Sequence, residues 1–367
     1  MIDNRDRLQT LLKSEGIWLE PDACLERDPG PLPSSLAFDR IEGMLLGLAI
    51  GDSLGNTTES QNPLKRKANR GEIRDYQPHP YAGNQAVGLP SDDTQLAFWS
   101  LEQLIADKGL VPQNLAHRLT SGQIFGMGQT MRQFLVHFKS KKRAWDRSGV
   151  PSAGNGALMR IAPVLLPHLR NPSSALYADA ALAAMITHND PASNAACVAF
   201  VHLLWQALQL EQPPERGWWT RTFLEVMTPL EGSSRYSPRS PLVKFEHDGP
   251  VSVFAAQRVS EALAAESSVL DACESWHSGA YLLETVPSVL FILDTCGHDP
   301  EEAIVRAVND TRDNDTIASI VGTAVGALHG AQALPTRWRE KLLGRTTADD
   351  DGRVQTLIQE ARQTFWD

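Results

Sequence analysis

Three short stretches of the sequence contain clustered carboxylates beside hydroxyl side chains. They are residues Gly51 to Gly55 with the nearby Glu59, residues Ser91 to Thr94, and residues Asp313 to Thr316. In the last two, one Asp beside a hydroxyl residue fits simple capping of the helix that follows. Capping does not explain the second Asp, because carboxylates at close quarters repel strongly unless cations neutralise them. Since all the candidate ligands are oxygens, the pattern favours Mg²⁺ or Mn²⁺ over Zn²⁺.

Two glycine-rich segments offer the other half of a possible site. Residues 125–128 read Phe-Gly-Met-Gly, and residues 152–156 read Ser-Ala-Gly-Asn-Gly. Their backbone N–H groups suit a phosphate, and His188, at the end of a predicted helix, offers an imidazole that could face it. Each feature also has an ordinary interpretation, because a short Gly-x-Gly is usually a turn and a single histidine usually makes a core or capping hydrogen bond.

The elements that must position these residues are predicted to be helices. Apolar residues recur at i, i+3 and i+4 spacing in residues 93–108, 173–187, 191–210 and 301–308. Alternating, strand-like runs are scarce, and Pro and Gly cluster between the helical segments. The sequence therefore predicts an all-α fold with one main domain at residues 38–367, which contains an insertion or long loop at about 212–251.

Glycines recur every four residues in two apolar stretches of the main domain. One set is Gly43, Gly47, Gly51 and Gly55, and the other is Gly322, Gly326 and Gly330. Glycine costs about 1 kcal/mol relative to Ala inside a helix, so a repeated set on one helix face indicates close backbone packing. We expect both helices at the crowded centre of the fold, next to the acidic stretches that adjoin them.

Residues 1–37 form an acidic extension ahead of the main domain. The extension carries more acidic than basic residues, with a short apolar stripe at Leu8, Leu11 and Leu12 and an apolar group at residues 17–19. Its apolar residues either pack on its own domain or dock on a partner protein, since acidic segments with a few large apolar anchors suit such docking.

Composition narrows the partners and the compartment. The chain has 34 Lys and Arg against 44 Asp and Glu, a formal net charge of −10, and no long basic run, so nucleic acid is not an expected partner. The N-terminus is polar and no stretch approaches about 18 apolar residues, so we predict no membrane span, no secretory signal and a cytoplasmic location. The four cysteines are scattered, as buried thiols of a reducing compartment are.

Taken together and in this order, the motifs resemble the ADP-ribosylglycohydrolase family, which includes the dinitrogenase-reductase-activating glycohydrolases. Five stretches carry the resemblance: residues 40–55 with Glu59, residues 91–97, residues 152–160, residues 186–188, and residues 313–318 with the glycines at 322, 326 and 330. The resemblance implies a compact all-α fold with two Mg²⁺ or Mn²⁺ ions.

The resemblance also implies a role for individual residues. The implied metal ligands are Ser91, Asp92, Asp93, Asp313, Asp315 and Thr316. The residues implied to hold ADP-ribose are Gly126, Met127, Gly128, Ser152, Gly154, Asn155, Gly156 and His188. The residues implied to be catalytic are Glu59, beside the metals and the scissile ribose, with Asp92 and Asp315. Ser91 stands where the family usually has Thr, and Thr311-Arg312 replaces a usual Gly-Gly, but neither change removes an expected ligand.

The function implied by the resemblance is hydrolysis that releases ADP-ribose from a modified protein side chain, with arginine as the expected linkage. An alternative of a different class is an immunity protein that binds and blocks an ADP-ribosyltransferase toxin through residues 1–37, with or without hydrolase activity. A metal-dependent isoprenoid enzyme is disfavoured, because residues 92–96 lack the fifth-position acid that its Asp-rich motif requires.

Overall fold

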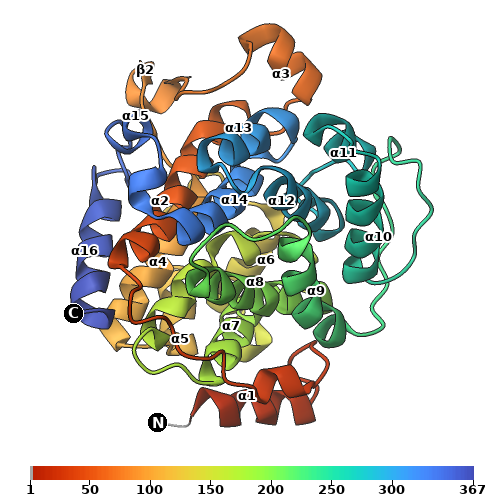
Figure 1. The fold of residues 1–367 in the computed structure, drawn as a ribbon. Helices are drawn as coiled ribbons and strands as arrows, with labels where there is room; N and C mark the ends of the chain where they lie inside the picture. Colours follow the sequence, from red (N-terminus) through yellow and green to blue (C-terminus); the bar gives the residue numbers. More distant parts are fainter. Residues whose placement is uncertain (1–2) are drawn as a thin grey trace.

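Helices build almost the whole of the computed structural model, which describes residues 3–367 (Figure 1). Within these residues the named strands are β1 (Pro78–His79) and β2 (Gln85–Ala86), an antiparallel pair in which Pro78 is opposite Ala86. The α-helices are α1 (Asn4–Lys13), α2 (Phe38–Gly55), α3 (Pro63–Arg70), α4 (Asp92–Asp107), α5 (Pro112–Arg118), α6 (Gln129–Leu135), α7 (Ala175–Met185), α8 (Pro191–Gln209), α9 (Trp218–Glu231), α10 (Val251–Ala264), α11 (Val269–Ser275), α12 (Leu282–Cys296), α13 (Pro300–Asp310), α14 (Asn314–His329), α15 (Thr336–Arg339) and α16 (Arg353–Phe365). This architecture confirms the predicted all-α fold. Among the described helices, none is long and apolar enough to cross a lipid bilayer.

Helices α2 and α14 lie side by side and antiparallel at the centre of the molecule (Figure 1). Gly47 packs directly on Gly322, and Gly43 packs on Gly326, so that a Cβ on any of the four would overlap backbone atoms of the other helix. Only glycine permits backbones to approach so closely, which offsets its unfavourable helix propensity. The glycine repeats therefore mark the central helix pair, as predicted.

The central pair brings two acidic stretches together. Because the helices are antiparallel, the last turn of α2 meets the first turn of α14, and a Cβ on Gly55 would lie 2.5 Å from the Asp315 Cα atom. Asp52 lies in that last turn of α2, and Asp313 and Asp315 stand at the start of α14. The glycine packing thus positions carboxylates that are far apart in the sequence.

Helix α4 brings the third acidic stretch to the same place. Ser91 is its N-cap and accepts a hydrogen bond from the Asp93 N–H, with Asp92 and Asp93 in the first turn. Residues from Leu96 to Leu101 are buried, so the helix is anchored in the core below its acidic start. The start of the helix, with its exposed N–H groups, faces the other two acidic stretches.

The described part of the acidic extension, residues 3–37, packs on the main domain. Leu8 and Leu11 of α1 are buried, α1 contacts α7, and Ile17 and Leu19 are buried further along. The backbone of the segment is also held, since Asn189 exchanges hydrogen bonds with the Gly16 carbonyl and the Trp18 N–H. The Trp18 side chain is 49% exposed, which leaves one large apolar group of the extension on the surface. Residues 1 and 2 of the extension lie outside the described residues.

The segment at about 212–251, expected to be an insertion or a long loop, contains a helix and so is not one continuous loop. Helix α9 spans Trp218–Glu231 and buries one face, including Trp219 and Phe223, against α8. Its first turn is capped from α12, because the Asp294 carboxylate accepts hydrogen bonds from the N–H groups of Gly217, Trp219 and Thr220. Trp219, Phe223, Val226 and Leu230 do follow helical spacing, so the sequence held a local signal for this helix, which Pro229 and the lack of a local N-cap weaken.

Candidate functional site

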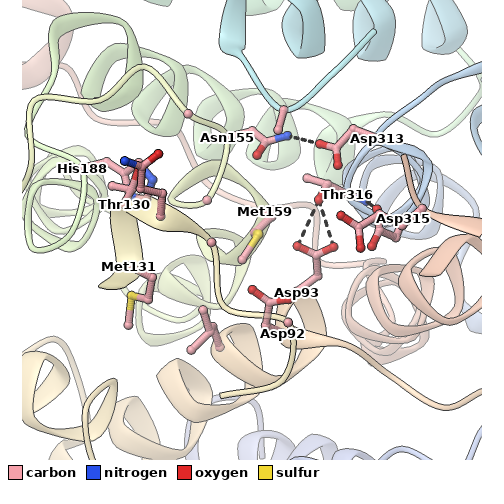
Figure 2. A pocket seen from close by; sticks show the side chains of 18 residues that line it. Asp92, Asp93, Thr130, Met131, Asn155, Met159, His188, Asp313, Asp315 and Thr316 are labelled. Carbon is pink, nitrogen blue, oxygen red and sulfur yellow. Dashed lines mark hydrogen bonds between the residues drawn. The ribbon is translucent and has the colours of Figure 1, made fainter. Parts of the chain in front are cut away.

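The three acidic stretches converge on one cavity of about 210 Å³ (Figure 2). Its carboxylate side comes from Glu59, a short turn beyond the end of α2, and from the first turns of α4 and α14. Its other side comes mainly from residues between α5 and α8. The predicted residues that line the cavity are Glu59, Asp92, Asp93, Gly126, Gly128, Gly154, Asn155, Gly156, His188, Asp313, Asp315 and Thr316. Most of the residues that the motifs singled out therefore meet in one place.

The carboxylates form two groups of three that share Asp315. Oxygen atoms of Asp52, Asp93 and Asp315 lie within 4.8 Å of one another, and so do oxygen atoms of Glu59, Asp313 and Asp315. Such spacing suits one hard cation between each set of oxygens. Two ions held this way would have Asp315 in common, which is the arrangement expected of a two-metal centre.

Burial and mutual repulsion keep protons on these carboxyl groups in the protein without ions. Burial, followed by the nearby Asp52, raises the pKa of Asp92 to about 8. Burial also raises the pKa of Asp313 to about 7 and those of Asp93 and Asp315 well above their usual range. Among the described residues that line the cavity, none is Lys or Arg. The site therefore lacks a protein cation to balance its carboxylates, and the all-oxygen donor set fits Mg²⁺ or Mn²⁺.

Hydrogen bonds hold individual carboxylate side chains of the cavity in position. The Thr316 hydroxyl donates to both Asp93 oxygens, at 3.1 and 3.3 Å, and the Asn155 amide donates to Asp313 at 2.6 Å (Figure 2). The Asn155 amide also donates to the hydroxyl of Thr285. The carboxylates of Glu59, Asp92, Asp93, Asp313 and Asp315 form one wall of the cavity, the acidic wall. The Asn155 bond connects this wall to the glycine-rich loop at residues 152–156, so the two motifs form a single site.

Asp52 is a buried residue of the site to which sequence reasoning had assigned no role. Its carboxylate accepts hydrogen bonds from the backbone N–H and the hydroxyl of both Ser91 and Thr94. With its oxygens engaged by these four donors and by the Asn56 amide, Asp52 fixes the first turn of α4, and its oxygens also lie close to those of Asp93 and Asp315. The sequence signal for Asp52 is its position between Gly51 and Gly55, in the first of the three acidic stretches.

Ser91 faces Asp52 rather than the cavity. Its hydroxyl donates to an Asp52 oxygen at 2.6 Å, so the geometry gives Ser91 a structural partner, while its proposed role as a metal ligand stays a prediction. The serine keeps the hydroxyl that the family's usual threonine would provide.

The wall opposite the carboxylates is formed by glycines and His188 (Figure 2). Gly156 and Gly154 lie directly before the imidazole, and a Cβ on Gly156 would be 3.1 Å from His188 Nε2. Gly126 has a φ of 63°, and a Cβ there would lie 2.9 Å from an Asp92 oxygen. Glycine at these positions keeps open the space between the imidazole and the carboxylates.

Two predicted contact residues do not line the cavity. Met127 is half-buried against the hydrophobic core, and the Ser152 hydroxyl hydrogen-bonds to Thr130 at 2.9 Å. The motif placed both correctly in the loops but could not show which way their side chains turn. The structure adds lining residues that no motif indicated: Leu96, Gln129, Thr130, Met131, Met159 and Ala280.

Comparison with known proteins identifies the family of this chain. A model of the ADP-ribosylglycohydrolase family matches residues 33–364. The ADP-ribosylarginine hydrolase Tri1 of Pseudomonas putida is 25% identical, over 94% of this chain and 81% of its own. The ADP-ribosyl-[dinitrogen reductase] glycohydrolase of Rhodospirillum rubrum is 26% identical, over 87% of this chain and 96% of its own. A solved structure described as an ADP-ribosylglycohydrolase-related protein complex superposes with a TM-score of 0.63 at 26% identity, covering 89% of this chain and 98% of that one. The chain therefore belongs to the ADP-ribosylglycohydrolase family.

Proposed function

We propose that this protein is a metal-dependent hydrolase that removes ADP-ribose from modified arginine side chains. The observation that carries the proposal is the pair of carboxylate groups sharing Asp315, set across a cavity from a wall of glycines and His188. The arginine linkage is supported by two relatives, the ADP-ribosylarginine hydrolases Tri1 of Pseudomonas putida and Serratia proteamaculans. The second is 27% identical over 89% of this chain.

The binding roles follow from the two walls. We assign Asp92, Asp93, Asp313, Asp315 and the hydroxyl groups of Ser91 and Thr316 to two Mg²⁺ or Mn²⁺ ions. Bound there, the ions would supply positive charge that orients the ribose hydroxyls and makes a water molecule more acidic. The glycine-rich loops and His188 take the diphosphate and ribose oxygens through N–H donors.

Cleavage at the anomeric carbon requires a proton acceptor for water and a proton donor for the leaving group, because the transition state resembles an oxocarbenium ion. Glu59 lies at the exposed edge of the acidic wall, within 4.8 Å of Asp313 and Asp315 oxygens, and is our candidate to accept the water proton. Burial and the nearby Asp52 raise the pKa of Glu59, which suits a group that gains and returns a proton. Asp315, shared by both carboxylate groups, is the alternative acceptor.

The test is release of ADP-ribose from an arginine-ADP-ribosylated protein. Release should occur with Mg²⁺ or Mn²⁺, stop with EDTA, and be lost in the Asp315→Ala variant. Near-normal release by a metal-replete Asp315→Ala protein would contradict the assignment of the site. Release from serine-linked but not arginine-linked substrate would replace the linkage while keeping the hydrolase.

A second candidate function is supported by the surface of the acidic extension. Trp18 is 49% exposed beside a cavity of about 480 Å³ that the extension forms with the main domain, and the exposed acidic residues Glu15 and Glu20 line the same cavity. A large aromatic group among carboxylates suits a protein partner with a basic surface. This supports the proposal that residues 1–37 bind and block an ADP-ribosyltransferase toxin.

Binding of purified bacterial ADP-ribosyltransferases to the full chain tests this second function. The Trp18→Ala variant should bind more weakly by about tenfold or more, while ADP-ribose release stays unchanged. Leu242→Ala is the control, because Leu242 is a 61% exposed apolar residue elsewhere on the surface. Equal binding by the wild type and the Trp18→Ala variant would remove the extension from this role.

A further inference from the structure

Arg160 is a buried cation immediately behind the histidine wall of the cavity. Its side chain is 1% exposed, and it donates hydrogen bonds to the Ala183 carbonyl at 3.0 Å and to the Thr187 Oγ1 at 2.8 Å. Among the described residues, no ion pair includes Arg160. The thiol of the nearby Cys197 is no counter-charge, because burial raises its pKa to about 12. Burying an unpaired guanidinium is costly, so its position indicates a use for its donors.

The Thr187 hydroxyl connects Arg160 to His188. Its oxygen accepts from Arg160 and lies 2.8 Å from His188 Nδ1, and Thr187 is fully buried. A guanidinium can only donate, so the hydroxyl proton must find its acceptor elsewhere. The acceptor in place for it is His188 Nδ1, and any other arrangement would leave a buried O–H proton without a partner.

The imidazole of His188 then has one possible form. Burial, with a smaller contribution from Arg160, lowers its pKa to about 3, so the ring is neutral and carries a single proton. Because Nδ1 accepts from Thr187, that proton is on Nε2. Nε2 is the nitrogen that faces the open space before Gly154 and Gly156, on the side of the cavity opposite the carboxylates (Figure 2).

We propose that Arg160 and Thr187 are positioning residues that hold His188 in the Nε2–H tautomer and so direct an N–H donor at an oxygen of bound ADP-ribose. The assignment of the ligand rests on the proposed function. The hydrogen bonds from Arg160 to Thr187 and from Thr187 to His188 fix which ring nitrogen of His188 carries the proton. Residues behind a metal ligand fix the tautomer of a coordinating histidine in the same way. It also links two motifs, residues 152–160 and 186–188, through residues that do not touch the cavity.

Thr187→Val and Thr187→Ser form a matched pair for the test, because valine removes the hydroxyl at nearly constant shape and serine retains it. In the full chain labelled with ¹⁵N-histidine, the ring nitrogens of His188 are assigned by the signals lost in His188→Gln. The wild type and Thr187→Ser should show a protonated Nε2 and an unprotonated Nδ1. Thr187→Val should show a mixture of the two tautomers. The Kd for ADP-ribose should rise about twofold in Thr187→Val, in proportion to the fraction of His188 that leaves the Nε2–H form, and stay close to the wild-type value in Thr187→Ser.

The NMR measurement needs no ADP-ribose, so it decides the tautomer even if the wild-type chain binds none, which would contradict the proposed function instead. A wild-type His188 with its proton on Nδ1, or a Thr187→Val variant with the wild-type tautomer, would overturn the proposal. An altered tautomer with unchanged affinity would overturn the claim that Nε2–H contacts ADP-ribose. Arg160→Lys, which retains a donor, should keep the tautomer, whereas Arg160→Met should not.

Discussion

Both walls of the cavity contain buried titratable side chains, but these side chains find their partners in different ways. The acidic wall gathers Asp93, Asp313 and Asp315, whose pKa values are all raised, with no protein cation among the described lining residues. The opposite wall holds His188, whose pKa is lowered and whose Nδ1 is hydrogen-bonded within the chain. Burial raises the pKa of an acid and lowers that of a base, so both shifts have one cause. The acidic wall therefore offers sites that could hold cations from solution, whereas His188 in the opposite wall finds its hydrogen-bond partner within the chain itself.

Among the variants considered, removal of the shared Asp315 carboxylate should have the largest effect on ADP-ribose release. Asp315→Ala takes one ligand from both carboxylate groups, so ADP-ribose release at saturating Mg²⁺ should fall at least about a hundredfold. Asp294→Ala is the control, because Asp294 is a buried acid that caps α9 outside the cavity. It should cost stability but leave metal-dependent release intact in the folded fraction. A similar loss of release in both variants would show that the effect is not specific to the site.

A milder change to the acidic wall is Asp52→Asn. The amide would place an NH₂ group against the donors of Ser91 and Thr94, which should disturb the first turn of α4 and weaken metal affinity about tenfold to a hundredfold. Calorimetric titration with Mn²⁺ measures the effect. Asp294→Asn makes the same substitution in a carboxylate that also caps a helix, and its Mn²⁺ affinity should match the wild type. An unaffected Asp52→Asn would show that Asp52 does not position the ligands.

The acidic wall should also make the stability of the ion-free protein fall as the pH rises, and added Mg²⁺ should restore the lost stability. The folded-state pKa values of Asp92 and Asp313, about 8 and about 7, lie above the ordinary value of 3.8, so the folded protein without ions keeps protons that the unfolded chain releases. This contribution is complete below about pH 4 and is lost as the pH rises to about 8. In EDTA, Tm should therefore fall by about 5 °C or more between pH 5 and pH 8, and Mg²⁺ should restore more at pH 8 than at pH 5.

The Asp313→Asn variant is the control for this pH dependence, because its amide cannot titrate. Its Tm in EDTA should change less with pH over the same interval than that of the wild type. An increase of the wild-type Tm from pH 5 to pH 8 in EDTA would mean that these carboxyl groups do not dominate the balance in that range.

The smallest effect is expected at the wall that contains His188, where a change of pH should not alter the charge of the imidazole. Since burial lowers the pKa of His188 to about 3, the ring stays neutral from about pH 5 upward. The affinity for ADP-ribose, measured by titration at fixed saturating Mg²⁺, should therefore have no inflection near pH 6.5 that His188→Gln removes. An inflection near pH 6.5 that is present in the wild type and absent in His188→Gln would show that the ring titrates in solution.

Much of the fold was predictable because its signals are local. Apolar spacing indicated α4, α7, α8 and α13, and the glycine repeats indicated the central pair of α2 and α14, because periodicity and missing side chains are properties of a short stretch. Helix α9 was not predicted although its apolar residues have helical spacing, because it contains Pro229 and its N-cap partner, Asp294, is distant in the sequence. The acidic and glycine-rich stretches of the site were likewise visible, but not which of their side chains enter the cavity.

The sequence by itself determined the family and the helical class, and it indicated the acidic stretches that meet at the cavity, since these depend on residue types in a fixed order. Only the tertiary structure decided that Asp52 caps α4, that Asp315 is shared by two carboxylate groups, and that Arg160 reaches His188 through Thr187. These relations depend on the direction of side chains from helices that are far apart along the chain. Burial then sets the protonation of each group, and burial exists only once the helices have packed.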